Sequence, residues 1–326
     1  MMEATIVQSI GETHRSDRLR GFSRILIVTI ATLGFLAIAQ SIHSKVMAAE
    51  QLTFSTPDAA VDALVAAVAA DDVEKLVDIF GREYESDLIG GDEIAFRETR
   101  KILASALAEA ASLHDGDMDT KNLIVGAKAW PFPFPIVRQA GAWRFDTAVG
   151  IDEVINRRIG RNELDAIELC RAYVDAQVQY AGTDHDEDDV REFAQKILSE
   201  EGQKDGLYWK TGDGEALSPF GPLVADARNY LEGREVGDPF KGYYYKIITR
   251  QSAEASGGRY DYIINGNMIA GFALIAFPAD YGNSGIMTFI CNHQGKVYQT
   301  DLGEDSDLIA SGMTVYNPDS MWSEVR

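Results

Sequence analysis

The sequence predicts an α+β fold, because helical and strand-like patterns occupy separate stretches of the chain. Apolar residues recur at helical spacing over 56–111, and strand-like runs follow over 123–150. The same order returns with a helical stretch over 151–180 and β-rich runs after Pro239. We therefore expect two domains. Residues 52–150 would form N-terminal helices with a bent, cone-like antiparallel sheet, and residues 151–326 a spine helix with a wrapped antiparallel sheet.

The composition is that of a folded and strongly acidic protein. Hydrophobic residues make up 46% of the 326 residues, enough for a packed core. The formal net charge is -21, from 30 basic and 51 acidic residues. This balance argues against nucleic acid as a partner, because phosphate binding needs clustered Lys and Arg. It also argues against adhesion to anionic lipid through a basic face.

Residues 1–48 have the layout of a secretory signal peptide. Arginines precede the uncharged run ILIVTIATLGFLAIA, and Val46 and Ala48 fit the small-residue positions before a cleavage site. The alternative is an uncleaved anchor, because residues 25–44 contain no Asp, Glu, Lys or Arg and are just long enough to span a bilayer. Both alternatives place the body outside the cytoplasm, either periplasmic or secreted, or anchored at the inner membrane.

The first domain opens with two helices that have clear boundary signals. Thr56 is a natural N-cap and Pro57 a natural first helical residue. A second helix is expected to begin after Asp71 or Asp72 and to stop at Gly81.

A third helix and a hairpin complete the expected first domain. The helix is expected over about 92–111, and the polar stretch HDGDMDTKN, residues 114–122, is expected to be a loop. Two strands, over 123–139 and 142–150, would then be joined by a short turn at Gly141.

The first strand of this hairpin reads WPFPFP at its centre, and its prolines cannot donate ladder hydrogen bonds. We expect it to be an edge strand, or bulged and strongly bent. The favoured interpretation is that the hairpin closes the core of the domain, and the alternative is that it lines a ligand pocket. The candidate pocket residues are Trp130, Phe132, Trp143 and Phe145.

The second domain begins with a helical stretch that Gly160 is expected to split. The second piece would start at Asn162 as its cap and run to Tyr180. A further helix is expected over 223–231, and β-rich runs separated by Gly, Asn and Asp turns follow from 242 to 303.

The spacing of three aspartates, Asp184, Asp186 and Asp188, suggests a calcium-binding loop, but the residues that follow them do not fit one. An EF-hand loop starting at Asp184 needs Gly where Asp189 stands and Glu where Gln195 stands. We expect a charged helix start instead, because acidic residues favour the N-terminal end of the helix dipole. A short amphipathic helix would follow, with Phe193 and Ile197 inward.

No catalytic, cofactor-binding or metal-binding residues are predicted. The histidines of the mature chain, His114, His185 and His293, lie in separate polar stretches outside any HExxH motif. The stretch GNSG over 282–285 lacks the spacing of a nucleophile elbow and is expected to be a turn. No glycine-rich phosphate loop occurs.

Cys170 and Cys291 are the only cysteines. Outside the cytoplasm they could form one disulfide. The favoured alternative is two separate buried thiols, since each lies in an apolar pattern.

Two domain-level resemblances follow from these patterns. The first domain is similar to the cone-shaped domains of the nuclear-transport-factor-2-like superfamily, a resemblance that implies a pocket lined by a concave sheet but no particular chemistry. The matching residues are Thr56, Pro57, Ala60, Val61, Leu64, Asp72, Leu76 and Ile79. The second resembles the globular head of type IV pilins and pseudopilins. Its matching segments are Ala176 and Tyr180, Gly242 to Ile247, Phe272 to Pro278, and Ser284 to Tyr298. The membrane-inserting helix of pilins has no counterpart directly before this domain.

From about Phe54 onward the chain resembles the bacterial domain-of-unknown-function 2950 family. The segments WPFPFPIV, GYYYKIITRQ and GFALIAFPADYGNSGIMTF are among those that carry the resemblance. It implies a bacterial envelope protein and no assigned activity.

Two functions of different classes remain. The first is a non-catalytic envelope protein that acts as an interaction or binding module, with an envelope protein as its possible partner. The alternative is a ligand-binding or hydrolytic activity in the pocket of the first domain. Membrane contact is expected only through residues 1–48, if they are uncleaved.

Overall fold

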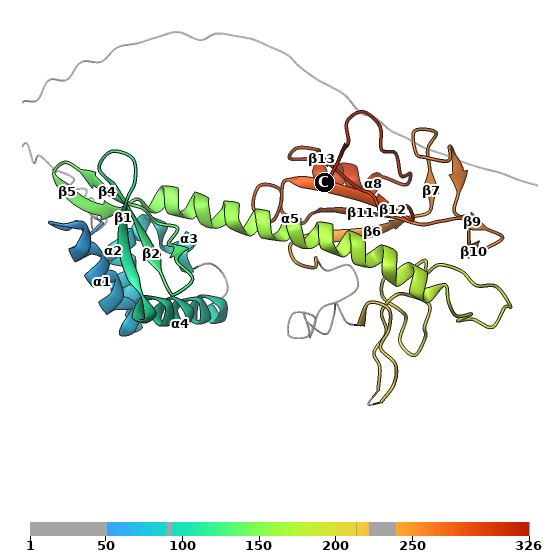
Figure 1. Cartoon of the computed structure of the whole chain (residues 1–326), viewed down its shortest axis with the longest axis horizontal. Coiled ribbons are helices and arrows are strands. Elements are labelled where there is room, and N and C mark those ends of the chain that lie inside the picture. Colours follow the sequence, from blue (N-terminus) through green and yellow to red (C-terminus); the bar gives the residue numbers. More distant parts are fainter. Residues whose placement is uncertain (1–50, 90–92, 213, 222–238, 326) are drawn as a thin grey trace, which may run out of the picture. The chain divides into compact units, whose positions relative to one another are not determined.

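The computed structural model describes residues 51–89, 93–212, 214–221 and 239–325 (Figure 1). It is a mixed α+β structure, as predicted. The expected signal segment over 1–48 and the expected helix over 223–231 lie outside the described residues. Within the described ranges, no helix has the length and apolar character needed to cross a membrane.

The helices of the N-terminal lobe begin where the capping signals place them. Helix α1 (Pro57–Ala69) is capped by Thr56, whose Oγ1 accepts the backbone N–H of Ala59 at 3.1 Å. Helix α2 (Val73–Phe80) is capped by Asp72, which accepts from Lys75 at 3.0 Å. It ends at Gly81, whose φ of 101° explains the glycine. A short 3-10 helix (Arg82–Tyr84), α3 (Glu85–Ile89) and α4 (Glu93–Glu109) follow.

The sheet of this lobe is antiparallel, in the order β1-β2-β4-β5, with β3 paired to β2. Its strands are β1 (Ala111–Asp115), β2 (Thr120–Val125), β3 (Trp130–Pro131), β4 (Ile136–Gln139) and β5 (Ala142–Phe145). The β4–β5 hairpin turns at Ala140 and Gly141, both with positive φ, as the expected turn at Gly141 requires.

Three sequence expectations for this sheet are wrong. The strand expected over 142–150 ends at Phe145, because Asp146 caps helix α5 (Thr147–Tyr180). The single strand expected over 123–139 is three short strands, because its prolines withhold ladder hydrogen bonds and a turn separates β2 from β3. The loop expected over 114–122 is mostly a hairpin, in which His114 pairs with Asn122 and Asp115 with Lys121. Most of these side chains are exposed at the sheet edge, so polarity does not distinguish them from a loop.

Helix α5 (Thr147–Tyr180) is continuous over 34 residues and serves both lobes (Figure 1). Asp146 caps it by accepting from Val149. The expected break at Gly160 is wrong, and so is the expected cap at Asn162, whose side-chain amide donates to the carbonyl oxygen of Ser284 at 2.8 Å. The expected domain boundary at 150/151 therefore falls inside a helix. The first turns of α5 pack on the N-terminal core and its later turns on the C-terminal core.

Gly160→Ala is expected to raise the free energy of unfolding by about 0.5–1 kcal/mol. A Cβ at this position would meet no atom within 4 Å, so only the helix preference of alanine over glycine changes. Urea denaturation followed by circular dichroism measures the effect. A destabilised variant would mean that the chain does break at Gly160.

The C-terminal lobe is built on an antiparallel sheet, as the short turns predict, and the order of its strands is β14-β13-β12-β11-β6. The strands are β6 (Tyr243–Ile248), β11 (Ala273–Pro278), β12 (Met287–Asn292), β13 (Val297–Asp301) and β14 (Ser323–Glu324). The pairs β7 (Arg250–Gln251) with β8 (Tyr260–Asp261) and β9 (Ile263–Ile264) with β10 (Asn267–Met268) are smaller. Helix α8 (Ser306–Gly312) completes the described elements.

The short helix expected after the aspartates is wrong, because the backbone of that segment bonds to distant partners. Phe193 donates to the carbonyl oxygen of Met268 at 2.8 Å, and Tyr208 donates to that of Ile197 at 2.8 Å. Phe193 and Ile197 nonetheless pack against the core, as their apolar character predicts.

Candidate ligand pocket

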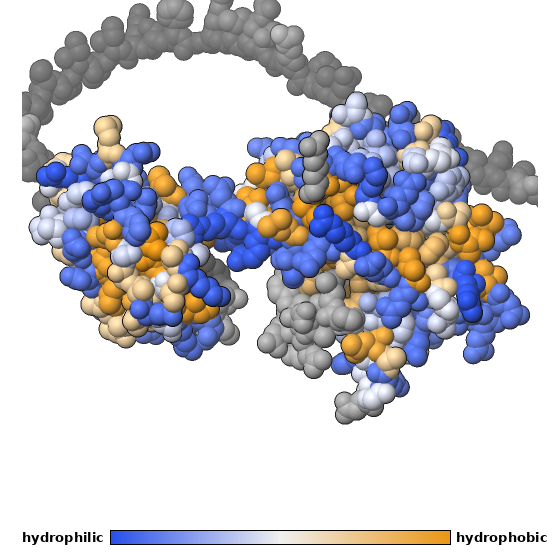
Figure 2. All heavy atoms as spheres, viewed as in Figure 1, coloured by the Kyte–Doolittle hydropathy of each residue, from blue (hydrophilic) through white to orange (hydrophobic). Residues whose placement is uncertain are grey.

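A cavity of about 1470 Å³ lies in the N-terminal lobe, and Asn283 of the C-terminal lobe is among its lining residues. Helices α2, α3 and α4, the β2–β3 turn, the proline-rich segment and the first turns of α5 supply its walls. Figure 2 shows hydrophobic side chains gathered on the visible face of this lobe. The main apolar lining residues are Val68, Leu76, Val77, Phe80, Leu88, Ile89, Phe96, Ile102, Leu103, Val125, Trp130, Phe132, Phe134, Ile151, Val154 and Ile155.

The floor of the pocket is a cluster of phenylalanine rings. Phe80 lies 4.7 Å from Phe134 and Phe132 lies 5.3 Å from Phe134, measured between ring centroids. Alternation along the proline-rich segment sends Phe132 and Phe134 to the same side, where both are buried. The ring of Phe145 packs against that of Phe80, with centroids 5.1 Å apart and the rings tilted by 51°. The proline-rich segment therefore closes the core, the favoured interpretation, and also forms one wall of a pocket.

Two of the four candidate pocket residues line the cavity, and the other two do not. Trp130 and Phe132 line the cavity, whereas Phe145 is completely buried in the core beside it. Trp143 does not line the pocket, since it pairs with Phe54 through two backbone hydrogen bonds and packs against the core.

Sequence reasoning missed the contribution of α5, where Ile151, Val154 and Ile155 line the pocket. The only available signal was their helical spacing.

The pocket exposes apolar side chains that a closed core would bury. Ile102 is 71% exposed, Trp130 46% and Val154 36%, although all three are lining residues. They come from three separate elements, α4, β3 and α5. Contiguous exposed apolar surface of this kind marks binding sites in soluble proteins.

The described lining carries more basic than acidic residues, in contrast to the chain as a whole. Two carboxylates, Asp87 and Glu109, are outnumbered by five basic residues. These five are Arg100, Lys128, Arg157, Arg158 and Arg161.

Two of the arginines are structural. Arg100 is only 8% exposed, lies over the ring of Phe96 at 4.4 Å, and donates from Nε to Asp71 at 2.7 Å. This hydrogen bond holds the pKa of Asp71 below its ordinary value. Arg157 donates to Glu153 at 2.7 Å and to the carbonyl oxygen of Pro131 at 2.8 Å, and so fastens α5 to β3.

Arg158 and Arg161 are the arginines that remain without an acidic partner among the described residues. Arg158 donates to the side-chain oxygen of Asn283 at 2.7 Å, and the Asn283 amide donates in turn to the Asp280 carboxylate at 2.8 Å, so no described carboxylate contacts the guanidinium group itself. Both side chains are exposed. They follow Val154 and Ile155 along the helix, so the pocket side of α5 changes from apolar to basic within about two turns.

The other groups singled out by the sequence do not form a reaction centre. His185 stacks on Tyr180 with ring centroids 4.1 Å apart, and His293 packs edge-on against Tyr262 at 5.7 Å. His114 lies in β1 of the N-terminal lobe, away from both of these histidines in the sequence. The segment 282–285 is the expected turn, closed by the N–H of Gly282 on the carbonyl oxygen of Gly285 at 2.9 Å.

The two cysteines are free thiols in one core. Cys170 on α5 and Cys291 on β12 are both completely buried, and Sγ of Cys291 lies 3.6 Å from the carbonyl oxygen of Cys170. Burial raises the pKa of the Cys291 thiol. The structure thus holds two free thiols rather than the disulfide that was the other alternative.

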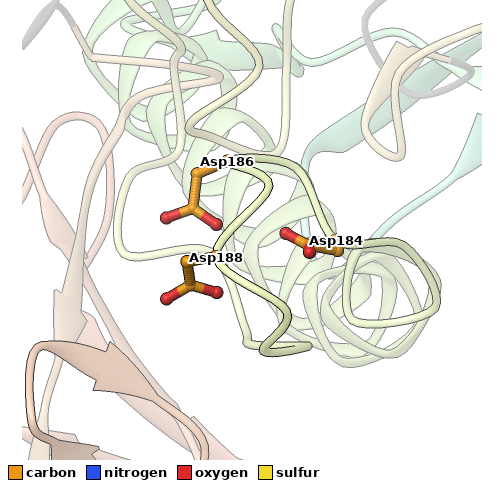
Figure 3. A group of neighbouring side chains, drawn as sticks. All are labelled: Asp184, Asp186 and Asp188. Atoms are coloured by element: carbon orange, nitrogen blue, oxygen red, sulfur yellow. The ribbon is translucent and has the colours of Figure 1, made fainter.

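The three aspartates lie in a loop, so the helix start expected there is wrong (Figure 3). One oxygen from each of Asp184, Asp186 and Asp188 comes within 4.8 Å of the others. Asp184 already accepts the backbone N–H groups of Glu187 and Asp189 at 2.9 and 3.0 Å. Desolvation and the Asp188 carboxylate raise the pKa of Asp186. These hydrogen bonds of Asp184 therefore hold the loop in its turn conformation.

These features define a two-lobed α+β protein whose N-terminal lobe carries a large apolar pocket with a basic end. Over residues 51–325 the chain matches the family described as "Protein of unknown function (DUF2950)", and it belongs to that family. No curated protein and no solved structure matches it. The likenesses to nuclear-transport-factor-2-like cones and to pilin heads accordingly stay predictions.

Proposed function

We propose that this protein is a non-catalytic binding module of the cell envelope that holds an apolar ligand in the pocket of its N-terminal lobe. The observation that carries the proposal is the open apolar cavity of about 1470 Å³, with exposed side chains from three elements. Ligand pockets commonly have volumes of about 300–1,000 Å³, so this cavity is large enough for a substantial molecule. The envelope location is supported by the signal-peptide layout of residues 1–48.

Binding is favoured over hydrolysis by the chemistry of the walls. The lining residues that the structure describes include neither histidine nor cysteine. Ser86, Asp87 and Glu109 lie among them, and no hydrogen bond joins any two of these three side chains as a nucleophile and its base would be joined. An apolar ligand needs no such groups, because removing apolar surface from water supplies its affinity.

Val154→Asp is expected to weaken binding of an uncharged fluorescent probe, N-phenyl-naphthylamine, by about tenfold or more. The new carboxylate would lie in the apolar wall, and the probe would have to desolvate it. The matched control is Leu164→Asp, which adds the same charge to the same helix at a residue that is 69% exposed and outside the pocket lining. This control is expected to bind the probe as the unchanged protein does.

A fluorescence titration decides between three outcomes. Selective loss in Val154→Asp supports the pocket. Equal binding by both variants would place the probe elsewhere, for example on the apolar run over 25–39, and would contradict the proposal. Absence of binding by the unchanged protein would contradict it as well.

A further inference from the structure

We infer that the occupant of the pocket is a lipid with an anionic head group, whose acyl chain lies against the phenylalanine floor and whose head group pairs with Arg158 and Arg161. This inference rests on the proposed function and names its ligand class. It is carried by the order of side chains along α5 and by the charge of the lining.

The order of side chains matches the polarity of a lipid. On α5, Ile151, Val154 and Ile155 line the pocket first, and Arg158 and Arg161 line it further along. At 100° per residue, Arg158 falls on the same helix face as the three apolar residues, and Arg161 falls beside it. Polarity thus changes along the helix axis. A docked amphipathic peptide helix would instead require an apolar strip with polar groups along both sides.

The guanidinium groups of Arg158 and Arg161, at the basic end of the pocket, can still donate hydrogen bonds to a ligand. Arg158 is held by the neutral side chain of Asn283, and its guanidinium group keeps further N–H donors. Arg161 makes no ion pair with any described residue. In a chain of net charge -21, two guanidinium groups that contact no described carboxylate favour an anionic ligand group.

The overall acidity of the chain does not oppose this inference. It disfavours broad adhesion to an anionic bilayer, which requires a basic face. A single lipid in a pocket needs only two or three donors for its head group, since carboxylate and phosphate oxygens accept strong hydrogen bonds from guanidinium groups. The aromatic ring of Trp130, half-exposed and 5.1 Å from the Arg157 guanidinium, suits the boundary between chain and head group.

The test compares dodecanoate with dodecanol, two ligands that share a chain and differ in head-group charge. Each displaces N-phenyl-naphthylamine from the full chain at concentrations below its own aggregation. We expect dodecanoate to bind more tightly, and the double substitution Arg158→Gln, Arg161→Gln to weaken dodecanoate by about tenfold while leaving dodecanol unchanged. Arg171→Gln, an exposed arginine of the same helix outside the pocket, is expected to change neither ligand.

Other outcomes overturn the inference and separate it from the proposed function. If both ligands bind equally, or if the double variant weakens both, the head-group site is wrong and the apolar pocket stands. If neither ligand displaces a bound probe, the occupant is not an acyl lipid. If the probe itself does not bind in the pocket, the proposed function fails first.

Discussion

Gly150→Ala is expected to destabilise the protein by about 1–3 kcal/mol, although alanine is the better helix former. A Cβ at Gly150 would lie 2.0 Å from the ring of Phe134, far inside van der Waals contact. The ring cannot move freely, because it packs against Phe80 at 4.7 Å and Phe132 at 5.3 Å. Urea denaturation of the full chain measures the loss. Gly160→Ala, where a Cβ meets nothing within 4 Å, is the matched control and is expected to stabilise.

A double-mutant cycle identifies the clash as the cause. Phe134→Ala alone is expected to cost about 3–5 kcal/mol, as large-to-small substitutions in cores do. In the Phe134→Ala background, Gly150→Ala is expected to cost nothing, because the ring that it meets is gone. An undiminished cost in that background would show that α5 does not approach the phenylalanine floor at Gly150.

Gln177→Leu is expected to destabilise the C-terminal lobe by about 2–4 kcal/mol, since it leaves several buried polar groups unpaired. Gln177 is completely buried and makes a two-way bond with Ala194, accepting its N–H and donating to its carbonyl oxygen, both at 2.8 Å. It also donates to the hydroxyl of Tyr173 at 3.0 Å. This single side chain therefore fastens the segment around Ala194 to α5.

Gln179→Leu is the control for this substitution, because Gln179 is exposed on the same helix. Its effect is expected to stay within about 0.5 kcal/mol. Hydrogen exchange provides the second readout, since Gln177→Leu should increase exchange of the backbone amides of residues 193–199. Equal stabilities of the two variants would contradict the role given to Gln177.

Local signals predicted the elements whose boundaries depend on neighbouring residues. The caps at Thr56 and Asp72 and the stop at Gly81 follow from side-chain or backbone chemistry within a single turn. The antiparallel sheet of the C-terminal lobe follows from its short turns. Helix breaking at Gly160 was predicted wrongly because a glycine costs only about 1 kcal/mol in a helix, which packing on two cores easily outweighs.

The remaining features depend on contacts between distant residues. The segment around Phe193 has a helical pattern, yet Gln177 and Met268 take its backbone hydrogen bonds. The pocket could be predicted only in part. Trp130 and Phe132 belong to one conspicuous segment. The other walls come from α3, α4 and α5, whose lining residues extend from Ser86 to Arg161. Nothing in a single sequence brings such segments together.

Photolabelling shows directly where an apolar ligand lies on the protein. The full chain would be irradiated with a diazirine-bearing fatty acid, and the labelled peptides identified by mass spectrometry. We expect labels on residues 123–134 and 147–161, and their loss in Val154→Asp but not in Leu164→Asp. Labels confined to the C-terminal lobe, or unchanged by Val154→Asp, would contradict a ligand pocket in the N-terminal lobe.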